Sequence, residues 1–164
     1  MDKSKRAVVY IGLGSNIGDK KANIERALAL LAATPEINVL EIAPFYRTAP
    51  QGYTEQDWFI NTVAKLETTL PPPELLDLLL TLENKIGRVR KERWGPRSID
   101  LDLLLYGNVI MDSQKLTLPH PRMHKRAFVM VPLADIAPQL TLPGYGRAAE
   151  LAGKLRLEQV VEPV

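Results

Sequence analysis

Two aspartates stand two residues apart in an otherwise apolar stretch, IDLDLLLY, beyond the middle of the chain. Alternate side chains of a β-strand share a face, so Asp100 and Asp102 are expected together, with their Cα atoms about 7 Å apart. Neighbouring carboxylates repel each other, and a bound Mg²⁺ ion relieves that repulsion. The pair is therefore a candidate metal site, with a solvated sheet face as the alternative. The opposite face is expected to hold Ile99, Leu101, Leu103 and Leu105.

Basic side chains are concentrated in two segments, residues 87–97 and 118–128, on either side of this strand. Guanidinium groups bind phosphate oxygens as planar forks, and carboxylates hold the Mg²⁺ that covers the other oxygens. An acid pair between such segments predicts a site for a metal-bound polyphosphate. A basic surface that contacts water or nucleic acid, with Trp94 stacked on a base, is the alternative. The basic residues are Arg88, Arg90, Lys91, Arg93 and Arg97 in the first segment, and His120, Arg122, His124, Lys125 and Arg126 in the second, with Lys115 just before it.

The glycine-rich segment GLGSNIGDK resembles a phosphate-binding loop only superficially. A Walker loop ends in Gly-Lys-Ser or Gly-Lys-Thr, and a dinucleotide fingerprint needs glycine where Ile17 stands. We therefore expect a tight turn from strand to helix, in which Asp19 caps the helix. The glycines that would allow unusual backbone angles in this turn are Gly12, Gly14 and Gly18.

The stretch WFINTV offers a second possible binding surface. Period-two alternation places Phe59 and Asn61 on one face, where a flat ring could stack on Phe59 while the amide reads its polar edge. A core aromatic residue beside an edge asparagine is an equally good interpretation. Glu83, just before the first basic segment, is ambiguous in the same way.

Composition limits the class of protein. The 164 residues are 46% hydrophobic, which fits one domain over residues 1–164 with a substantial core. A formal charge of +2 does not by itself favour a nucleic-acid partner. Because the chain has no cysteine, disulfides and thiolate sites are excluded. No run of 18 apolar residues predicts a membrane span, so we expect a soluble protein of the cytoplasm.

The order of expected elements is β-α-β-β-α-β, which is the ferredoxin-like α+β plan. In this plan an antiparallel sheet carries both helices on one face, and the other face is left for a site. A short helix containing Pro132 is expected near residues 127–136. Strands are expected at residues 6–13, 37–48, 58–68 and 99–105, and helices at residues 19–34 and 74–86, with Gly87 at the second helix's C-terminal cap.

Five segments together resemble one known family. They are GLGSNIGD, FYRTAPQG, FINTVAKLET, ENKIGRVRKERWGPRSIDLDLLLYG and LPHPRMHKRAFVMVPLADIAP, which span roughly residues 8–140. The family is 6-hydroxymethyl-7,8-dihydropterin pyrophosphokinase of the folate pathway. The most specific element is RWGPR followed three residues on by DLD. The resemblance implies transfer of pyrophosphate from ATP to the pterin, with release of AMP and with two Mg²⁺ ions.

The resemblance also assigns roles to individual residues. Asp100 and Asp102 correspond to the metal-binding pair, and Asp100 also to a pterin contact. The segment that carries Trp94 corresponds to a lid over the pterin, and Thr48 and Gln51 to a second mobile loop. The catalytic residues implied are Arg88, Arg97, Asp100 and Asp102, the ATP-binding residues Arg88, Arg97, Lys115, His120 and Arg126, and the pterin-binding residues Thr48, Phe59, Asn61, Trp94, Asp100 and Phe128.

Two positions depart from the family pattern, because Ala49 replaces a common proline and Pro121 replaces an aromatic residue after the histidine. The partners expected are the two small-molecule substrates, without nucleic acid or membrane, for a monomer or weak dimer. A phosphotransferase or nucleotidyltransferase that uses the same acid pair is one alternative. A non-catalytic nucleic-acid-binding domain is another.

Overall fold

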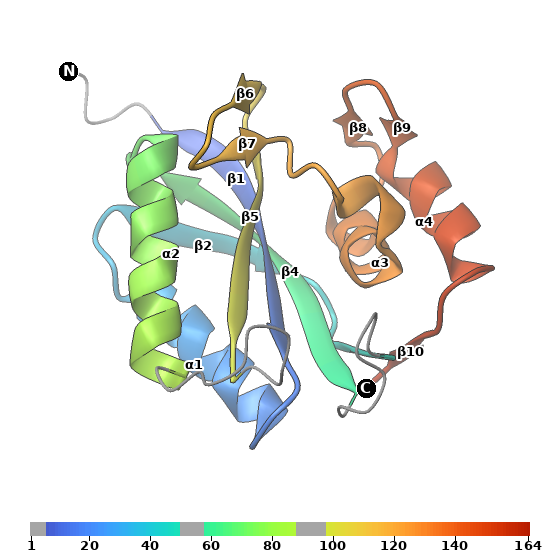
Figure 1. Cartoon of the computed structure of the whole chain (residues 1–164), viewed down its shortest axis with the longest axis horizontal. Helices are drawn as coiled ribbons and strands as arrows, with labels where there is room; N and C mark the ends of the chain where they lie inside the picture. Colours follow the sequence, from blue (N-terminus) through green and yellow to red (C-terminus); the bar gives the residue numbers. More distant parts are fainter. Residues whose placement is uncertain (1–5, 50–57, 88–97) are drawn as a thin grey trace.

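A six-stranded antiparallel sheet forms the centre of the structure, a computed structural model that describes residues 6–49, 58–87 and 98–164 (Figure 1). Five strands follow the order β10-β3-β4-β1-β5, and β2 pairs with the far end of β4. The long central strands are apolar on both faces, as expected for a sheet that is covered on both sides. Their bounds are β1 Ala7–Ser15, β2 Ile37–Ile42, β3 Tyr46–Thr48, β4 Phe59–Thr68, β5 Asp100–Tyr106 and β10 Val161–Pro163.

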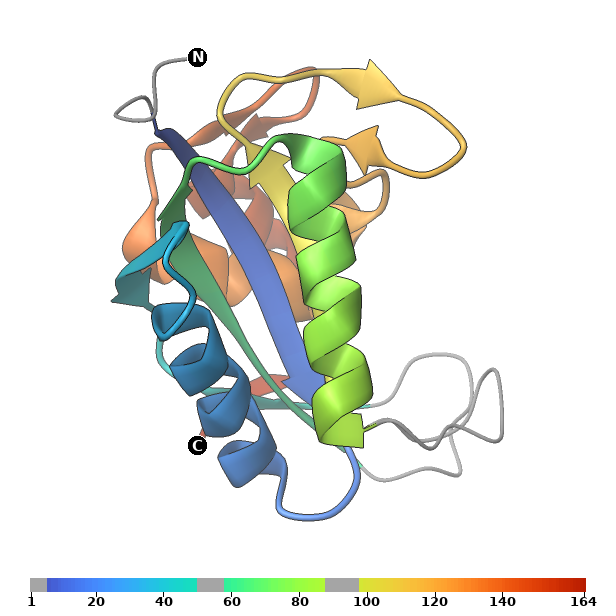
Figure 2. The same cartoon turned by 90° about the vertical axis from the view of Figure 1, so that its left-hand side faces the viewer.

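Helices α1 (Lys20–Ala32) and α2 (Pro72–Gly87) lie side by side on one face of the sheet (Figure 2). The apolar residues Ile24, Ala27, Leu28 and Leu31 recur at helical spacing in α1 and are all buried, as are Leu75, Leu79 and Leu82 of α2. Asp19 caps α1 as predicted, since its Oδ1 accepts a hydrogen bond from the backbone N–H of Ala22 at 3.2 Å. The ferredoxin-like α+β fold is confirmed.

The other face of the sheet is partly covered by the C-terminal third of the chain (Figure 1). Helices α3 (Ala127–Ile136) and α4 (Ala148–Arg156) build a second apolar cluster there with side chains of β1, β4 and β5. The helix predicted at 127–136 is confirmed, with Pro132 inside it. The remaining elements are the hairpin β6 (Met111–Asp112) and β7 (Thr117–Leu118), the 3₁₀ turn η1 (Met123–Lys125), and the hairpin β8 (Thr141–Leu142) and β9 (Gly146–Arg147).

Strand β5 alternates as predicted only over its first half. Leu101 and Leu103 pack against α1 and α2, which leaves Asp100 and Asp102 together on the opposite face. A β-bulge then shifts the register, because Tyr10 pairs with Leu105 while the next residue of β1 pairs with Leu103. The extra residue reverses the alternation, so the prediction that Leu105 shares a face with Leu101 is wrong, and Leu105 packs in the second cluster.

Two other local predictions are wrong. Gly12 and Gly14 lie inside β1 rather than in a turn, and of the three glycines in that segment Gly18 alone has a positive φ, 72°. The single strand predicted over 37–48 is interrupted at residues 43–45, although both halves pair with β4.

Gly87 ends α2, where an added Cβ would lie 2.4 Å from Cβ of Ser98, so close packing rather than a left-handed cap explains the glycine.

Candidate active site

The candidate site lies on the α3 side of the sheet, where three strands bring polar groups into one row. In the strand register Gly14 of β1 is directly opposite Asn61 of β4 on one side and opposite Asp100 of β5 on the other. Neighbouring strands are about 4.8 Å apart, so Asn61 and Asp100 stand about 10 Å apart across a residue without a side chain. The amide and the carboxylate therefore share one face of the sheet, on either side of Gly14.

Gly14 is required here by space and not by backbone angle. A Cβ at this position would lie 2.4 Å from Oδ1 of Asn61, well inside ordinary contact distance. Asn61 is 5% exposed, and its Nδ2 donates a hydrogen bond to Oγ1 of Thr48 at 2.6 Å. The glycine therefore allows the amide to keep its bond to Thr48. In the sequence, the period-two spacing of Gly12 and Gly14 is a sign that both glycines lie in a strand on one face. That Asn61 is the residue opposite Gly14 follows only from the strand register.

Arg126, at the N-terminus of α3, interacts electrostatically with both acids of the pair. Burial lowers the pKa of its guanidinium, whereas the negative charges of Asp102 and, more weakly, Asp100 raise it and nearby Arg122 lowers it. Arg126 is thus within electrostatic reach of both carboxylates. The structure brings together four residues that the sequence placed in separate segments, two acids from β5 and two arginines from the second basic segment.

His120 belongs to the same group and is held neutral by its surroundings. Burial, followed by the positive charges of Arg126 and Arg122, lowers the pKa of His120 to about 4. Its Nδ1 accepts a hydrogen bond from the backbone N–H of Arg122 at 3.2 Å, so the ring proton is on Nε2. Its backbone N–H donates to the carbonyl oxygen of Leu104 at 2.9 Å, which fixes the residue to β5. A neutral imidazole that carries its proton on Nε2 is suited to donate to a phosphate oxygen.

A cavity of about 210 Å³ is lined by Thr48, Ala49, Phe128 and residues 158–161. The guanidinium of Arg126 lies over the ring of Phe128, 5.3 Å from its centroid. Phe59 is opposite Thr48 in the register and shares a face with Asn61, as predicted from alternation. The predicted pterin residues are therefore linked in sequence of contact, Asn61 to Thr48 by a hydrogen bond and Thr48 to Phe128 across the cavity, and Phe128 also contacts Arg126.

Glu83, whose role is ambiguous in the sequence, has a structural role. Its carboxylate is buried at the end of α2, and Oε2 accepts a hydrogen bond from the backbone N–H of Leu101 at 2.7 Å. Leu101 stands between the two aspartates on β5, the outermost strand of the sheet within the described ranges. Glu83 therefore satisfies an N–H of the sheet edge and fixes the segment that carries Asp100 and Asp102.

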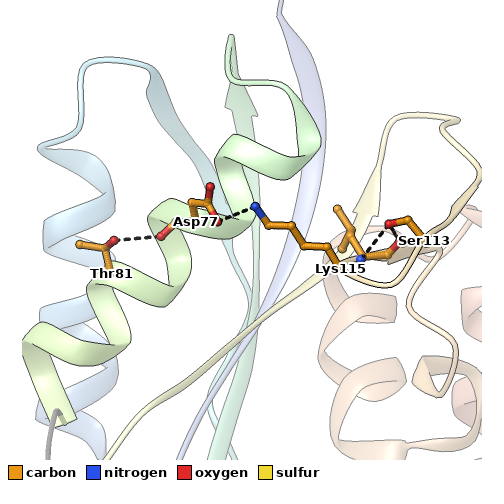
Figure 3. A network of polar contacts seen from close by, with 5 residues as sticks. Asp77, Thr81, Ser113 and Lys115 are labelled. Atoms are coloured by element: carbon orange, nitrogen blue, oxygen red, sulfur yellow. Dashed lines mark hydrogen bonds and ion pairs between the residues drawn. The ribbon is translucent and has the colours of Figure 1, made fainter.

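The remaining predicted site residues either make contacts away from the acid pair or lie outside the residues that the structure describes. Lys115, in the β6–β7 hairpin, forms an ion pair with Asp77 of α2, with 2.8 Å between Nζ and Oδ1 (Figure 3). His124 stacks on Tyr145 with 3.7 Å between ring centroids. Arg88, Arg97, Trp94, Gln51 and the predicted lid at 88–97 lie outside the described residues.

The donor set at the acid pair is compatible with Mg²⁺. Within residues 6–49, 58–87 and 98–164 no three acidic or histidine side chains gather closely enough to form a complete metal cage. Mg²⁺ is commonly bound by one or two carboxylates together with substrate phosphates and water. Asp100 and Asp102 beside Arg126 and His120 fit that arrangement.

The structure is thus an antiparallel α+β domain with two carboxylates near basic side chains on one face of its sheet. A family model described as 7,8-dihydro-6-hydroxymethylpterin-pyrophosphokinase (HPPK) matches residues 10–138, and the chain belongs to this family. The resemblance seen in the sequence motifs is thereby confirmed.

Two curated relatives match this chain over most of their length. The chain is 50% identical over 135 residues to a 2-amino-4-hydroxy-6-hydroxymethyldihydropteridine pyrophosphokinase of Methylorubrum extorquens, covering 82% of this chain and 85% of the relative. It is 43% identical over 152 residues to the enzyme of that name from Pseudomonas aeruginosa, covering 93% and 94%.

Solved structures support the fold. A crystal structure of an HPPK-DHPS in complex with substrates superposes with a TM-score of 0.73 at 13% identity, over 91% of this chain and 43% of that one. The wild-type HPPK-DHPS of Plasmodium falciparum gives a TM-score of 0.70 at 12% identity, over 92% and 41%. The chain thus spans less than half the length of these solved proteins.

Proposed function

We propose that this chain transfers pyrophosphate from ATP to 6-hydroxymethyl-7,8-dihydropterin, giving AMP and the pterin diphosphate in folate biosynthesis. Its membership of the HPPK family supports this reaction. In the structure, this reaction is supported most by the electrostatic interaction of Arg126 with both Asp100 and Asp102. His120, which is neutral, lies near Arg126. Such a site offers ligands for a metal and donors for phosphate oxygens on the same face of the sheet.

Asp100 and Asp102 are the residues that would hold two Mg²⁺ ions together with phosphate oxygens. When bound, Mg²⁺ neutralises phosphate charge and aligns the reacting oxygens. Glu83 contributes indirectly, because its bond to the N–H of Leu101 fixes the strand between the two acids.

Arg126 and His120 are proposed to bind the phosphates of ATP. The guanidinium offers a charged fork, and the Nε2–H of neutral His120 offers one directed donor. Arg88 and Arg97 retain the catalytic and ATP-binding roles implied by the family resemblance, as does Trp94 its role at the pterin. Lys115 can bind ATP only after leaving Asp77.

The pterin is proposed to lie beside Asn61, with Asn61 and Thr48 at its polar edge and Phe59 and Phe128 against its faces. The bond from Asn61 to Thr48 orients the amide before the ligand arrives. Phosphoryl transfer through a loose transition state requires mainly positioning and charge stabilisation, so a dedicated general base is not needed.

The remaining proposals concern the state of the protein. We propose one catalytic domain over residues 1–164, a monomer or weak dimer in the cytoplasm, with small-molecule substrates and no nucleic-acid or membrane partner. Among the described residues no helix is both long and apolar enough to cross a membrane.

Product analysis tests the reaction directly. Purified protein is incubated with MgATP and 6-hydroxymethyl-7,8-dihydropterin, and nucleotides and pterins are separated by chromatography. The expected result is AMP in equal amount to a pterin diphosphate. ADP with a pterin monophosphate would indicate an ordinary kinase, and free pyrophosphate with an adenylylated pterin would indicate a nucleotidyltransferase; either result contradicts the proposal.

A further inference from the structure

The side chain of Gln159, in the segment after α4, reaches back to the start of α3. Its Oε1 accepts a hydrogen bond from the backbone N–H of Ala127 at 2.9 Å, and its Nε2 donates to the carbonyl oxygen of Lys125 at 2.8 Å. These two groups belong to the peptide units immediately after and before Arg126. One amide therefore holds both peptide units that join Arg126 to its neighbours.

This contact replaces a local helix cap. Arg126 is the N-cap residue of α3, and its own side chain makes no capping hydrogen bond in the structure. The first N–H groups of a helix need acceptors from outside the helix, and Gln159 supplies one of them from 32 residues away. The backbone angles of Arg126 fix the direction of its Cα–Cβ bond, so the same contact sets where the side chain of Arg126 begins.

The segment that carries Gln159 is anchored at the candidate site on its other side as well. Val161 in β10 is directly opposite Thr48 in β3, and residues 158–161 line the cavity that Thr48 and Phe128 also line. The C-terminal segment thus joins the strand end proposed for the pterin to the helix start proposed for ATP. A displacement of this segment would change both.

We propose that Gln159 is a positioning residue that orients Arg126 and Phe128 for the two substrates, an inference that rests on the proposed function. It acts through the peptide units on either side of Arg126 and does not contact the reacting atoms. Its removal is expected to weaken substrate binding in the folded protein, which a purely structural role would not do.

The test compares Gln159→Leu with wild type and with Leu157→Gln, a control two residues away whose side chain is 89% exposed. Equilibrium dissociation constants for MgATP, KM values for both substrates and Tm are measured. Removing both hydrogen bonds should raise the dissociation constant for MgATP about tenfold, which corresponds to about 1.4 kcal/mol. Gln159→Glu keeps the acceptor for Ala127 but replaces the donor to Lys125 by an oxygen that repels its carbonyl, so it should also raise the dissociation constant for MgATP.

A double-variant cycle with Arg126→Ala identifies the route of the effect. If Gln159 acts through Arg126, Gln159→Leu should weaken MgATP binding little further in the Arg126→Ala background. A dissociation constant within twofold of wild type, or an equal loss in both backgrounds, would overturn the inference. So would failure of both Gln159 variants to fold. Absence of AMP formation by wild type would instead refute the proposed function.

Discussion

Replacing Gly14 by alanine should impair pterin binding while leaving the acid pair in place. The new Cβ would lie 2.4 Å from Oδ1 of Asn61, about 1 Å closer than ordinary contact allows. Asn61 is buried on β4, so its amide can avoid the methyl group only by rotating away from Thr48. The perturbation is therefore local, and the contact that it breaks is the hydrogen bond between Asn61 and Thr48.

The size of the effect follows from that hydrogen bond. A buried amide or hydroxyl that loses its partner costs roughly 1–3 kcal/mol. If this cost falls on the bound state, the KM for the pterin rises roughly 5- to 150-fold, since 1.4 kcal/mol is a factor of ten. The KM for ATP should change little, because the nearest atoms to the added Cβ belong to Asn61 and Ile60 and not to Asp100, Arg126 or His120.

Gly12→Ala is the matched control, two residues away on the same face of β1. Its added Cβ would lie 3.6 Å from Cδ1 of Leu104, an ordinary contact. Initial rates of AMP formation at varied pterin concentration should separate the two variants, with Gly12→Ala close to wild type. Equal pterin KM values for both variants, each with a wild-type circular dichroism spectrum, would refute the reasoning.

Three further changes test other contacts of the site. Glu83→Leu leaves the N–H of Leu101 without its carboxylate, and thermal unfolding should show a loss of roughly 1–3 kcal/mol; an unchanged Tm would contradict this role. Asp77→Asn releases half-exposed Lys115 at a stability cost under about 1 kcal/mol and should lower the KM for ATP; an unchanged KM argues against Lys115 as an ATP contact. The low pKa of His120, about 4 instead of 6.5, means that the unfolded chain binds the proton first as the pH falls. The Tm of wild type should therefore decrease relative to His120→Asn between pH 6.5 and pH 4, and a pH-independent difference would exclude this linkage.

Periodicity and local chemistry were sufficient to predict the main elements and the acid pair. The apolar stripes of α1 and α2, the Asp19 cap and the shared face of Asp100 and Asp102 all depend on residues close in sequence. Alternation failed at the bulge in β5, because an extra residue in one strand is defined only by the pairing with its partner.

The contacts that the sequence did not reveal join segments far apart in the chain. The sequence suggests that Gly14 is a turn residue. The reason for the glycine is the close approach of Asn61, which comes from another strand and is not visible in the sequence. Gln159 gave no signal, since a single glutamine after a helix is ordinary and its targets lie 32 and 34 residues earlier. The ion pair of Lys115 with Asp77 depends in the same way on how a hairpin packs beside a helix.

The role of the acid pair is tested most directly by the rate of AMP formation in Asp102→Asn, a nearly isosteric change that removes one charge opposite Arg126. The rate is measured at saturating MgATP and pterin, with circular dichroism and Tm to establish that the variant is folded. We predict a loss of about 100-fold or more, the scale on which a lost electrostatic group affects a transition state. A folded Asp102→Asn protein that forms AMP at nearly the wild-type rate would contradict the proposal that this pair holds the metal for the reaction.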